Sequence, residues 1–285
     1  MHREYGQVAI ISFYRIEWGY ELVKQEVPSM KGKLVFISGA SSGIGEACGE
    51  VFARAGASLI LCARNKEKLQ RVAQHFQETY QTKVLVKELD VRKQEAVEAV
   101  IDSLEEEWKA IDILINNAGL ALGLDKLQEG NPQEWDVMLD TNVKGLLYLT
   151  RKIVPMMLER GTGHVINIGS TAGIHAYPGG AVYCATKAAV KFLSDGLRMD
   201  AVDTPLRVTN IQPGMVETNF SVIRFRGSQE KADGVYEGIQ PLVAADIADI
   251  VFYAASAPPH VQICEVTVTP THQATGGIVH KEAKK

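Results

Sequence analysis

The chain has 285 residues, of which 46% are hydrophobic and 22% are charged, and its formal net charge at pH 7 is −4. This composition is typical of a soluble globular protein, and the length fits one large α/β domain or two small ones. Because there is no basic excess and no apolar run near the roughly 18 residues of a membrane span, neither a nucleic acid nor a membrane is expected as a partner.

Residues 1–29 are predicted to be an N-terminal extension of unknown role. They contain a short β-like segment at 8–14, but they lack the composition and the cleavage site of a targeting peptide. From Met30 onward a charged start leads into an apolar strand, so Met30 is expected to be the original start or the beginning of the folded domain, 30–285. The alternative is that residues 1–29 form an arm that packs on a neighbouring subunit.

Apolar runs bounded by turn residues alternate with segments of helical period along the rest of the chain. This alternation is typical of the buried strands of a parallel sheet and the helices between them. The predicted strands are 34–38, 58–63, 83–88, 111–116, 164–168, 207–211 and 263–268, and the predicted helices include 45–55, 66–80, 93–108, 183–200 and 244–255. The sequence therefore predicts a single α/β domain, a doubly wound seven-stranded parallel sheet of the Rossmann type, whose ligands bind beyond the carboxyl ends of the strands.

A glycine-rich loop, S-G-A-S-S-G-I-G, follows the first predicted strand at residues 38–45. In such a loop Gly39 permits the tight turn, Gly43 lets the backbone approach a pyrophosphate, and Gly45 lets helix and strand pack closely. The helix that follows would contribute amide groups and a partial positive charge. This arrangement of strand, glycine loop and helix predicts a dinucleotide site.

The end of the second predicted strand distinguishes NAD from NADP. An acidic residue there would accept hydrogen bonds from the ribose 2′-OH of NAD, whereas a nearby arginine accommodates the 2′-phosphate of NADP. The sequence at 61–65 is L-C-A-R-N, without a carboxylate, and the guanidinium of Arg64 is suited to phosphate. NADP(H) is therefore the predicted cofactor, with Ser41 and Asn65 near its phosphates. The alternative is that Arg64 is a solvated loop residue.

Further motifs follow the glycine loop in the order and spacing of one family. The spacing G-x-x-x-G-x-G resembles that of short-chain dehydrogenases/reductases, and the resemblance extends over nearly everything from Met30 onward. The residues that carry it are Asn116-Asn117-Ala118-Gly119, Asn142, Ser170, Tyr183, Lys187, Pro213-Gly214 and Thr218. The resemblance implies a cofactor bound by Gly39, Ser41, Ser42, Gly43, Ile44, Gly45, Arg64, Asn65, Asp90, Val91, Asn117, Ala118, Gly119, Tyr183, Lys187, Pro213, Gly214, Val216 and Thr218.

Tyr183 and Lys187 are the candidate catalytic pair. Hydride transfer to a carbonyl places negative charge on its oxygen, so the site needs a proton donor and hydrogen bonds aimed at that oxygen. The pair stands at i and i+4 on one helix face, where the ammonium and an oxidised nicotinamide would lower the pKa of Tyr183. Tyr183 is predicted to be the general acid in reduction and the general base in oxidation, and Ser170 to hydrogen-bond the substrate oxygen. The resemblance implies that Lys187 also holds the nicotinamide ribose, and that Asn142 interrupts its helix and binds a water linking Lys187 to solvent.

Residues 215–240 are predicted to be the substrate loop. This charged segment and others resemble those of the NADP-dependent 3-hydroxy acid (serine 3-) dehydrogenase group, although the sequence after Pro213-Gly214 lacks the extra glycines that are common there. The resemblance implies oxidation of serine, allo-threonine and simple 3-hydroxy acids, and reduction of malonic semialdehyde. Such substrates carry a carboxylate, which Arg224 or Arg226 could bind bidentately. The alternative is that these arginines belong to a solvated lid or a subunit contact.

The cysteines and histidines do not indicate a structural site. Cys48, Cys62, Cys184 and Cys264 lie far apart without a C-x-x-C pair, which argues against a disulfide framework and against a zinc site. The seven histidines show no H-E-x-x-H or clustered spacing, so no metal is expected. Reduced thiols favour a cytoplasmic protein.

Two other functions remain open from the sequence. The first is a broader NADPH-dependent carbonyl reductase that acts on ketones, sterols or 3-oxoacyl compounds. The second is an NADP(H)-sensing regulator without turnover, which would not need the proton relay of Tyr183, Lys187, Ser170 and Asn142. The expected partners are a small hydroxy or oxo substrate and, as the resemblance implies, further copies of the chain in a homo-oligomer, a tetramer or a dimer.

Overall fold

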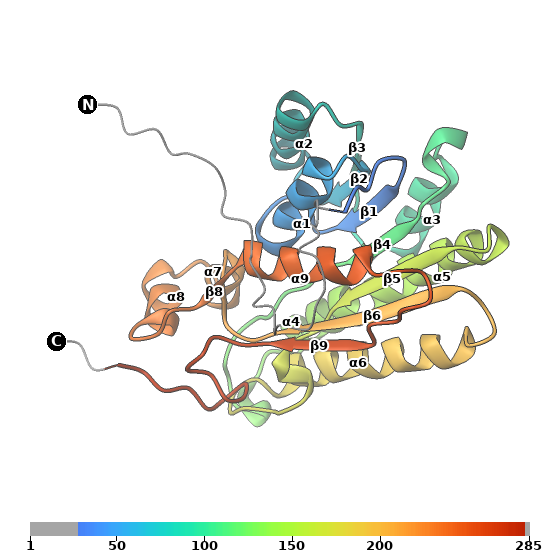
Figure 1. The fold of residues 1–285 in the computed structure, drawn as a ribbon. Coiled ribbons are helices and arrows are strands. Elements are labelled where there is room, and N and C mark those ends of the chain that lie inside the picture. Colours follow the sequence, from blue (N-terminus) through green and yellow to red (C-terminus); the bar gives the residue numbers. More distant parts are fainter. Residues whose placement is uncertain (1–27, 283–285) are drawn as a thin grey trace, which may run out of the picture.

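The structure is a computed structural model that describes residues 28–282 (Figure 1). The β-like segment predicted at 8–14, and nearly all of the predicted extension 1–29, lie outside the described residues. Within the described part of the chain, no helix combines the length and the apolar character that a membrane crossing requires.

Seven parallel strands form the central sheet, in the order β3-β2-β1-β4-β5-β6-β9. Their bounds are β1 (Leu34–Ser38), β2 (Ser58–Ala63), β3 (Val84–Glu88), β4 (Ile113–Asn116), β5 (Gly163–Ile168), β6 (Leu206–Pro213) and β9 (Glu265–Val268). The strand order reverses between β1 and β4, which creates a crevice at their carboxyl ends. The predicted doubly wound seven-stranded sheet is confirmed.

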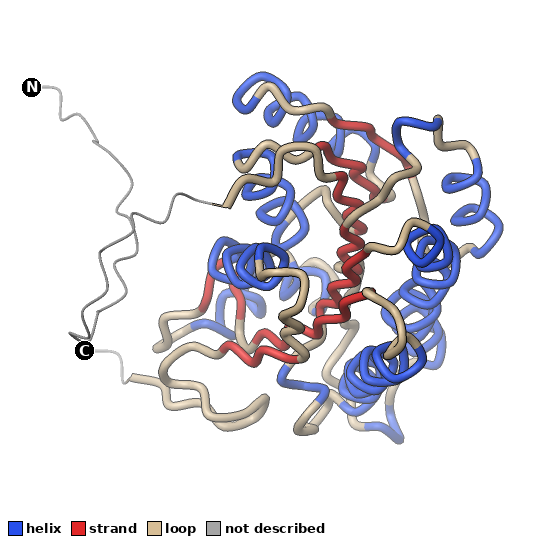
Figure 2. Tube along the Cα trace, turned by 45° about the vertical axis from the view of Figure 1, so that its right-hand side comes forward, coloured by secondary structure: helices blue, strands red, loops and turns tan. Residues whose placement is uncertain are grey.

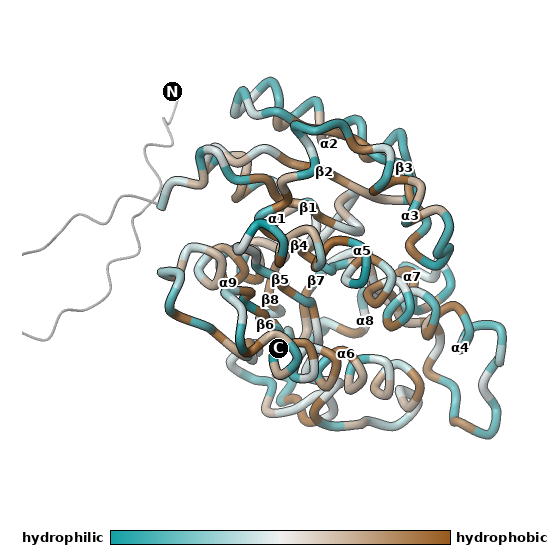
Figure 3. Tube along the Cα trace, turned by 90° about the vertical axis from the view of Figure 1, so that its right-hand side faces the viewer, coloured by the Kyte–Doolittle hydropathy of each residue, from teal (hydrophilic) through white to brown (hydrophobic). Residues whose placement is uncertain are grey.

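Helices cover both faces of the sheet (Figure 2). One face packs against α1 (Gly43–Arg54), α2 (Lys66–Tyr80) and α9 (Ala244–Ser256), and the other against α3 (Gln94–Asp102), α5 (Gly145–Glu159) and α6 (Ala181–Asp200). The two cores arise from the alternation of a strand: Val35 and Ile37 point to the first face, and Leu34 and Phe36 to the second. Figure 3 shows α2 largely in teal, as expected of a helix that buries only one face.

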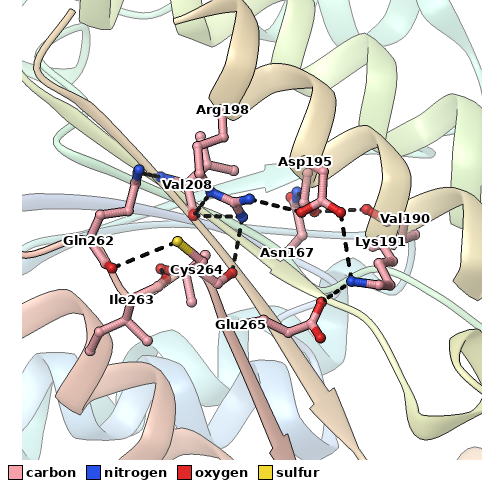
Figure 4. A network of polar contacts seen from close by, with 12 residues as sticks. Asn167, Val190, Lys191, Asp195, Arg198, Val208, Gln262, Ile263, Cys264 and Glu265 are labelled. Atoms are coloured by element: carbon pink, nitrogen blue, oxygen red, sulfur yellow. Dashed lines mark hydrogen bonds and ion pairs between the residues drawn. The ribbon is translucent and has the colours of Figure 1, made fainter. Parts of the chain in front are cut away.

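A network of polar contacts fixes α6 to the edge of the sheet (Figure 4). The guanidinium of Arg198 donates to the carbonyl oxygens of Val208 on β6, at 3.3 Å, and of Cys264, at 3.0 Å. Lys191 Nζ pairs with Glu265 on β9 at 2.6 Å. Because these contacts join α6 to two neighbouring strands, they fix the helix that carries both predicted catalytic side chains.

The predicted helix 93–108 is wrong in its second half. Helix α3 ends at Asp102, and a separate 3₁₀ turn, Glu106–Trp108, follows. The hydroxyl of Ser103 donates back to the carbonyl of Val100, a local bond that competes with helix continuation. Leu104, just after it, is buried in the core although it is no longer helical, so the apolar periodicity continued past the end of the helix.

The predicted substrate loop contains regular structure. It contains β7 (Val216–Glu217), α7 (Phe220–Arg224) and α8 (Gln229–Tyr236). Strand β8 (Leu242–Val243), just after it, pairs with β7. We call residues 215–240 the substrate segment. Another stretch relevant to the site combines α4 (Pro132–Leu139), a π-helical turn (Asp140–Lys144) and α5 without a break.

The chain that follows β9 returns across the substrate segment. The side-chain oxygen of Gln273 accepts a hydrogen bond from the amide of Met215 at 2.7 Å. Lys281 Nζ donates to the carbonyl oxygens of Gly234 and Val235 on α8, at 3.1 and 3.0 Å. The C-terminal segment therefore holds the substrate segment near its beginning and near its end.

Candidate active site

A cavity of about 860 Å³ lies at the carboxyl ends of the central strands, beside the point where the strand order reverses. Most of the residues predicted as site residues line it. These are Gly39, Ser41, Ser42, Gly43, Ile44, Arg64, Asn65, Asp90, Val91, Asn117, Ala118, Gly119, Ser170, Tyr183, Lys187, Pro213, Gly214, Val216, Thr218 and Arg224. The predicted site residues Gly45, Asn142 and Arg226 lie outside its wall.

The glycine loop needs glycine for two different reasons. Gly39 and Gly43 have φ angles of +68° and +59°, in the left-handed region that disfavours side chains. A Cβ at Gly45 would overlap the carbonyl oxygen of Gly39 and lie 2.5 Å from Asn117 Nδ2. Asn117 Nδ2 itself donates to the carbonyl oxygens of Ser38 and Gly39, at 3.0 and 3.1 Å. The loop is thus held close to the end of β4 by contacts that leave no room for a side chain at Gly45.

Two cations lie beyond the end of β2, where no carboxylate follows the strand. Arg64 is exposed and lines the cavity. Asn65 also lines it, but its side-chain oxygen accepts from the amide of Lys68 at 2.8 Å and so caps α2. Lys68 lines the cavity too. Lys68 was not predicted as a site residue, although its position one helical turn after Arg64 could have indicated it.

The carboxylate after β3 is already paired. Asp90 binds the Arg92 guanidinium with an N···O distance of 2.6 Å, and this hydrogen bonding holds the pKa of Asp90 below its usual range. Val91 is buried beside it, and a Cβ at Gly145 would lie 2.6 Å from the Val91 side chain. Arg92 and, more weakly, Arg64 both lower the pKa of Asp90, so this carboxylate faces two cations at this end of the cavity.

Tyr183, Lys187 and Ser170 meet on the opposite side of the cavity. Tyr183 lies in the first turn of α6, and Lys187 one turn later, with Nζ 6.0 Å from the centroid of the Tyr183 ring. Lys187 Nζ donates to the carbonyl oxygen of Ile168 at 2.7 Å, which ties the ammonium to the end of β5. Ser170 Oγ accepts from the amide of Ala172 at 3.1 Å. The structure thus brings together the three side chains that the sequence proposed for proton transfer.

Burial changes the pKa values of both members of the pair. It lowers the pKa of Lys187 to about 8. It raises the pKa of Tyr183, while a hydrogen bond with Ser170 and the charge of Arg224 act in the opposite direction. The sequence predicted a pKa of Tyr183 lowered by Lys187 together with an oxidised nicotinamide. The direction in this structure is the reverse, because desolvation of the phenol outweighs the groups that favour the phenolate.

Asn142 lies in the π-helical turn between α4 and α5, so the helix interruption that the resemblance implied is present. Its Oδ1 accepts from the amide of Leu120, and its Nδ2 donates to the carbonyl of the same residue, both at 2.8 Å. Nδ2 also donates to Thr186 Oγ1 on α6 at 3.0 Å. Asn142 therefore joins the loop after β4 to the catalytic helix. Thr186, which the sequence analysis missed, has no motif that would mark it.

Arg224 on α7 lies over the aromatic rings of the site. Its guanidinium carbon is 5.3 Å from the ring centroid of Tyr177 and 5.4 Å from that of Tyr183. Its Nη2 donates to the Tyr177 hydroxyl at 2.5 Å. Tyr177 was not predicted as a site residue, because it precedes the catalytic motif without being part of a recognisable pattern. A cation is thus fixed in the cavity wall beside the proposed proton donor.

Arg226 does not enter the cavity, contrary to its prediction as an alternative carboxylate ligand. Its Nε pairs with Glu134 at 2.6 Å and its Nη2 with Asp125 at 2.9 Å. Two carboxylates therefore hold its side chain outside the wall. The two arginines looked equivalent in sequence, and contacts with residues about 100 positions away separate them.

Gly214, which was predicted to bind the cofactor, is also a point of close approach between two segments of the chain. It lines the cavity, but a Cβ there would overlap the side-chain oxygen of Gln273. Gln273 is 5% exposed and also lines the cavity. The small residue after β6 thus allows the C-terminal segment to approach, a contact between distant residues that the sequence analysis missed.

Comparison with known proteins identifies the family. The family model of short chain dehydrogenases matches residues 33–227, more than half of the chain. NADP-dependent 3-hydroxy acid dehydrogenase YdfG from Salmonella typhi is 44% identical over 250 residues, covering 87% of this chain and 99% of the relative. Sulfoacetaldehyde reductase 2 from Chromohalobacter salexigens is 42% identical over 242 residues, covering 85% of this chain and 95% of the relative.

A solved structure has a similar fold. The closed form of serine dehydrogenase complexed with NADP+ superposes with a TM-score of 0.82 and 41% sequence identity, covering 87% of this chain and 100% of that one. The resemblance to an oxidoreductase family that the sequence motifs indicated is therefore confirmed. The chain belongs to the short-chain dehydrogenase family.

Proposed function

We propose that the chain is an NADP(H)-dependent oxidoreductase that interconverts small 3-hydroxy acids, of the serine, allo-threonine and 3-hydroxypropionate type, and their 3-oxo forms. The observation that carries this proposal is the position of Arg224, which lines the cavity 5.4 Å from the ring centroid of Tyr183. A cation at this place suits a substrate whose carboxylate stands close to the carbon that reacts.

Three features support NADP(H) as the cofactor. Arg64 and Lys68 line the cavity beyond β2, where an acidic residue would have favoured NAD. Ser42 and Gly43 line the cavity at the N-terminus of α1, where a pyrophosphate would bind. The relative from Salmonella typhi is named NADP-dependent, and the solved serine dehydrogenase holds NADP+. When bound, the cofactor supplies or accepts the hydride.

The protein's own residues would manage the proton and the charge on the substrate oxygen. Tyr183 donates a proton to that oxygen in reduction and removes it in oxidation. Burial raises the pKa of Tyr183, whereas a general acid works best with a pKa near the operating pH. The charges of Lys187 and of an oxidised nicotinamide would offset this shift. Ser170 hydrogen-bonds the same oxygen. Lys187 holds the nicotinamide ribose and, when charged, stabilises the phenolate left after proton transfer, and Asn142 belongs to the relay that returns the proton.

Arg224 would bind the acidic group of the substrate. The Tyr177 hydroxyl takes one of its Nη2 hydrogen bonds, which fixes the plane of the guanidinium and leaves further donors for an anion. A sulfonate carries the same charge as a carboxylate. The relative from Chromohalobacter salexigens is named for the reduction of a sulfonated aldehyde, so a small anionic carbonyl compound is the common substrate class that this proposal selects.

A broader carbonyl reductase is the competing proposal, because Leu124, Ile223 and Phe225 also line the cavity and favour a neutral substrate. Initial rates with NADPH and NADH on malonic semialdehyde and propanal separate the two. We expect NADPH and the anionic aldehyde to be preferred, and Arg224→Gln to raise the KM for malonic semialdehyde by at least about tenfold. Arg71→Gln, at an exposed position on α2, is the matched control.

Two other results of these rate measurements would favour a different function. Equal use of propanal by the wild-type enzyme would favour the broader reductase. Tight binding of NADPH without turnover of any hydroxy or oxo compound would favour a cofactor-sensing regulator.

A homo-oligomer, a tetramer or a dimer, and a cytoplasmic location are also part of the proposal. On α6, Phe192 and Met199 are 71% and 73% exposed, and Tyr253 on α9 is 65% exposed. Apolar side chains on such surfaces are typical of subunit contacts. Light scattering after size-exclusion chromatography tests the oligomer, and a monomer at micromolar concentration would contradict it.

A further inference from the structure

Arg226 and its partners form a compact ion-pair cluster at the rim of the cavity. The Arg226 cluster consists of Arg226, Glu134 on α4 and Asp125 in the loop after β4. Glu134 accepts from Arg226 Nε at 2.6 Å and from Nη2 at 2.8 Å, and Asp125 accepts from Nη2 at 2.9 Å. The side chain of Glu134 is only 16% exposed, whereas those of Arg226 and Asp125 are 53% and 41% exposed. One arginine thus connects the substrate segment to two elements from the other half of the chain.

The backbone around the cluster is shaped for this contact. Arg226 has a φ of +54°, a left-handed conformation that is uncommon for a residue with a side chain. Gly123 has a φ of +70°, and a Cβ there would lie 2.6 Å from Asp125 Oδ2 and 3.1 Å from Arg226 Nη2. The glycine at 123 therefore leaves the space that the Arg226–Asp125 pair occupies.

Gly123 also holds Arg224 in position. The amide of Gly123 donates to the carbonyl oxygen of Arg224 at 2.9 Å, and Arg224 Nε donates to the carbonyl of Gly123 at 3.4 Å. Helix α7, which carries Arg224, has five residues, and Ser221 is its one buried residue. So short a helix has little stability of its own. Its contacts with the loop after β4 therefore have a large share in placing the Arg224 side chain.

We propose that Arg226 is a positioning residue: its ion pairs with Glu134 and Asp125 hold the end of α7 against the loop after β4 and so keep Arg224 in the cavity wall beside Tyr183. This inference rests on the proposed function, because the position of Arg224 affects turnover only if Arg224 binds the anionic group of the substrate. Arg226 itself does not line the cavity in which substrate and cofactor would bind.

Loss of the cluster should act on substrate affinity and not on proton transfer. If α7 leaves the loop in part of the molecules, only the remaining fraction presents Arg224, and the apparent affinity falls by that fraction. Once an anionic substrate is bound, Tyr183, Ser170 and Lys187 still stand in place. KM for the anionic substrate should therefore rise with kcat nearly unchanged, and a neutral substrate should be insensitive.

The experiment compares Arg226→Gln, Glu134→Gln and Arg226→Lys with the wild-type enzyme on malonic semialdehyde and on propanal. Because exposed ion pairs shift an equilibrium by up to about fivefold, we expect Arg226→Gln to raise the KM for malonic semialdehyde measurably and by no more than that factor, with propanal kinetics unchanged. Arg226→Lys should raise the KM less than Arg226→Gln does, since lysine keeps the positive charge but lacks the bidentate guanidinium. Adding Glu134→Gln to Arg226→Gln should cost nothing further, because both remove the same contact.

Lys83→Gln is the control, because it removes the remote exposed ion pair with Glu107. An Arg226→Gln enzyme with wild-type KM for malonic semialdehyde, or with equal losses on propanal, would overturn the inference. If Arg224→Gln had no effect on malonic semialdehyde, the proposed function itself would fail instead.

A second measurement tests the contact without turnover. Amide hydrogen exchange at Gly123, whose N–H is bonded to Arg224, should become faster in Arg226→Gln and remain unchanged in Lys83→Gln. Unchanged exchange at Gly123 in Arg226→Gln would show that the cluster does not hold α7, whatever the substrate of the enzyme.

Discussion

The cofactor side and the substrate side of the cavity are built in different ways. On the cofactor side, the glycine loop follows a strand that is buried along its whole length, and backbone approach excludes a side chain at Gly45. On the substrate side, α7 and α8 bury one residue each, Ser221 and Ala232. Side-chain contacts such as Arg226 with Glu134, 92 positions away, hold that region in place.

This difference explains how such a chain can keep its cofactor and vary its substrate. The glycine loop leaves no room for side chains at some of its positions, so substitutions there disrupt the fold. A segment held by a few exposed polar pairs can be rebuilt at small cost in stability. We therefore expect substitutions on the cofactor side to affect folding and cofactor binding, and substitutions on the substrate side to affect the choice of substrate.

The largest effect is expected at Tyr183, where the two sides meet. Tyr183→Phe keeps the ring that packs 5.6 Å from Phe220 but removes the proton donor. Because general acid catalysis contributes about 10²- to 10⁴-fold, kcat for reduction should decrease by a factor in that range. The affinity for NADPH, measured by fluorescence titration, should remain unchanged. An enzyme that kept most of its activity would have another proton donor.

The same substitution, glycine to alanine, should have opposite effects in the two regions. Gly45→Ala places a methyl group against the Gly39 carbonyl and should destabilise the fold by about 1–3 kcal/mol through overpacking. Gly234→Ala on α8 has no atom within 4 Å of the new Cβ, and it should stabilise the helix by up to about 1 kcal/mol. Urea unfolding of both variants measures the difference. Equal destabilisation would show that the two regions do not differ in this respect.

Arg64→Asp sharpens the comparison within the cofactor side, where an exposed side chain and not the backbone selects the cofactor. Loss of charged hydrogen bonds to the 2′-phosphate should weaken NADPH binding by at least about tenfold, whereas NADH binding should weaken less or improve. Arg71→Asp, one helical turn beyond Lys68 on the exposed face of α2, is the control. Unchanged NADPH affinity in Arg64→Asp would refute the assignment of Arg64.

The pH profile should reflect the buried lysine. The pKa of Lys187 is about 8, lowered by burial from its ordinary value, so the ammonium is present below pH 8 and is lost as the pH rises. Tyr183 stays protonated over this range because its pKa is raised. We expect kcat/KM for reduction to be flat up to about pH 7 and to be about tenfold lower one unit above the pKa. A profile that stays flat to pH 10 would show that reduction does not need the charged lysine.

The sequence predicted the fold well because the sheet depends on local patterns. Apolar runs between turn residues marked the strands, and glycine spacing marked the loop after β1. The helix break after Asp102 was not predicted, since Leu104 continues the apolar periodicity in a non-helical conformation. The helices α7 and α8 were not predicted either, because they bury too few residues to produce an apolar period.

Site residues could be predicted from the sequence only where they lie close together along the chain. Tyr183 and Lys187 share a helix turn, so their spacing identified them. The choice between Arg224 and Arg226 depended on Glu134, Asp125 and Tyr177, and pairing across such distances has no pattern in a single sequence. The raised pKa of Tyr183 depends on burial, which the i and i+4 spacing does not contain.

The return of the C-terminal segment has a practical consequence for handling the protein. Gln273 lines the cavity and receives the amide of Met215, and Lys281 holds the carbonyl end of α8. Gln273 and Gly276 are therefore part of the wall of the cavity, and Lys281 contacts a helix of the substrate segment. A fusion partner or a surface linker attached after Lys281 should therefore disturb the substrate pocket. In such a preparation, the KM for the substrate should change more than the KM for the cofactor.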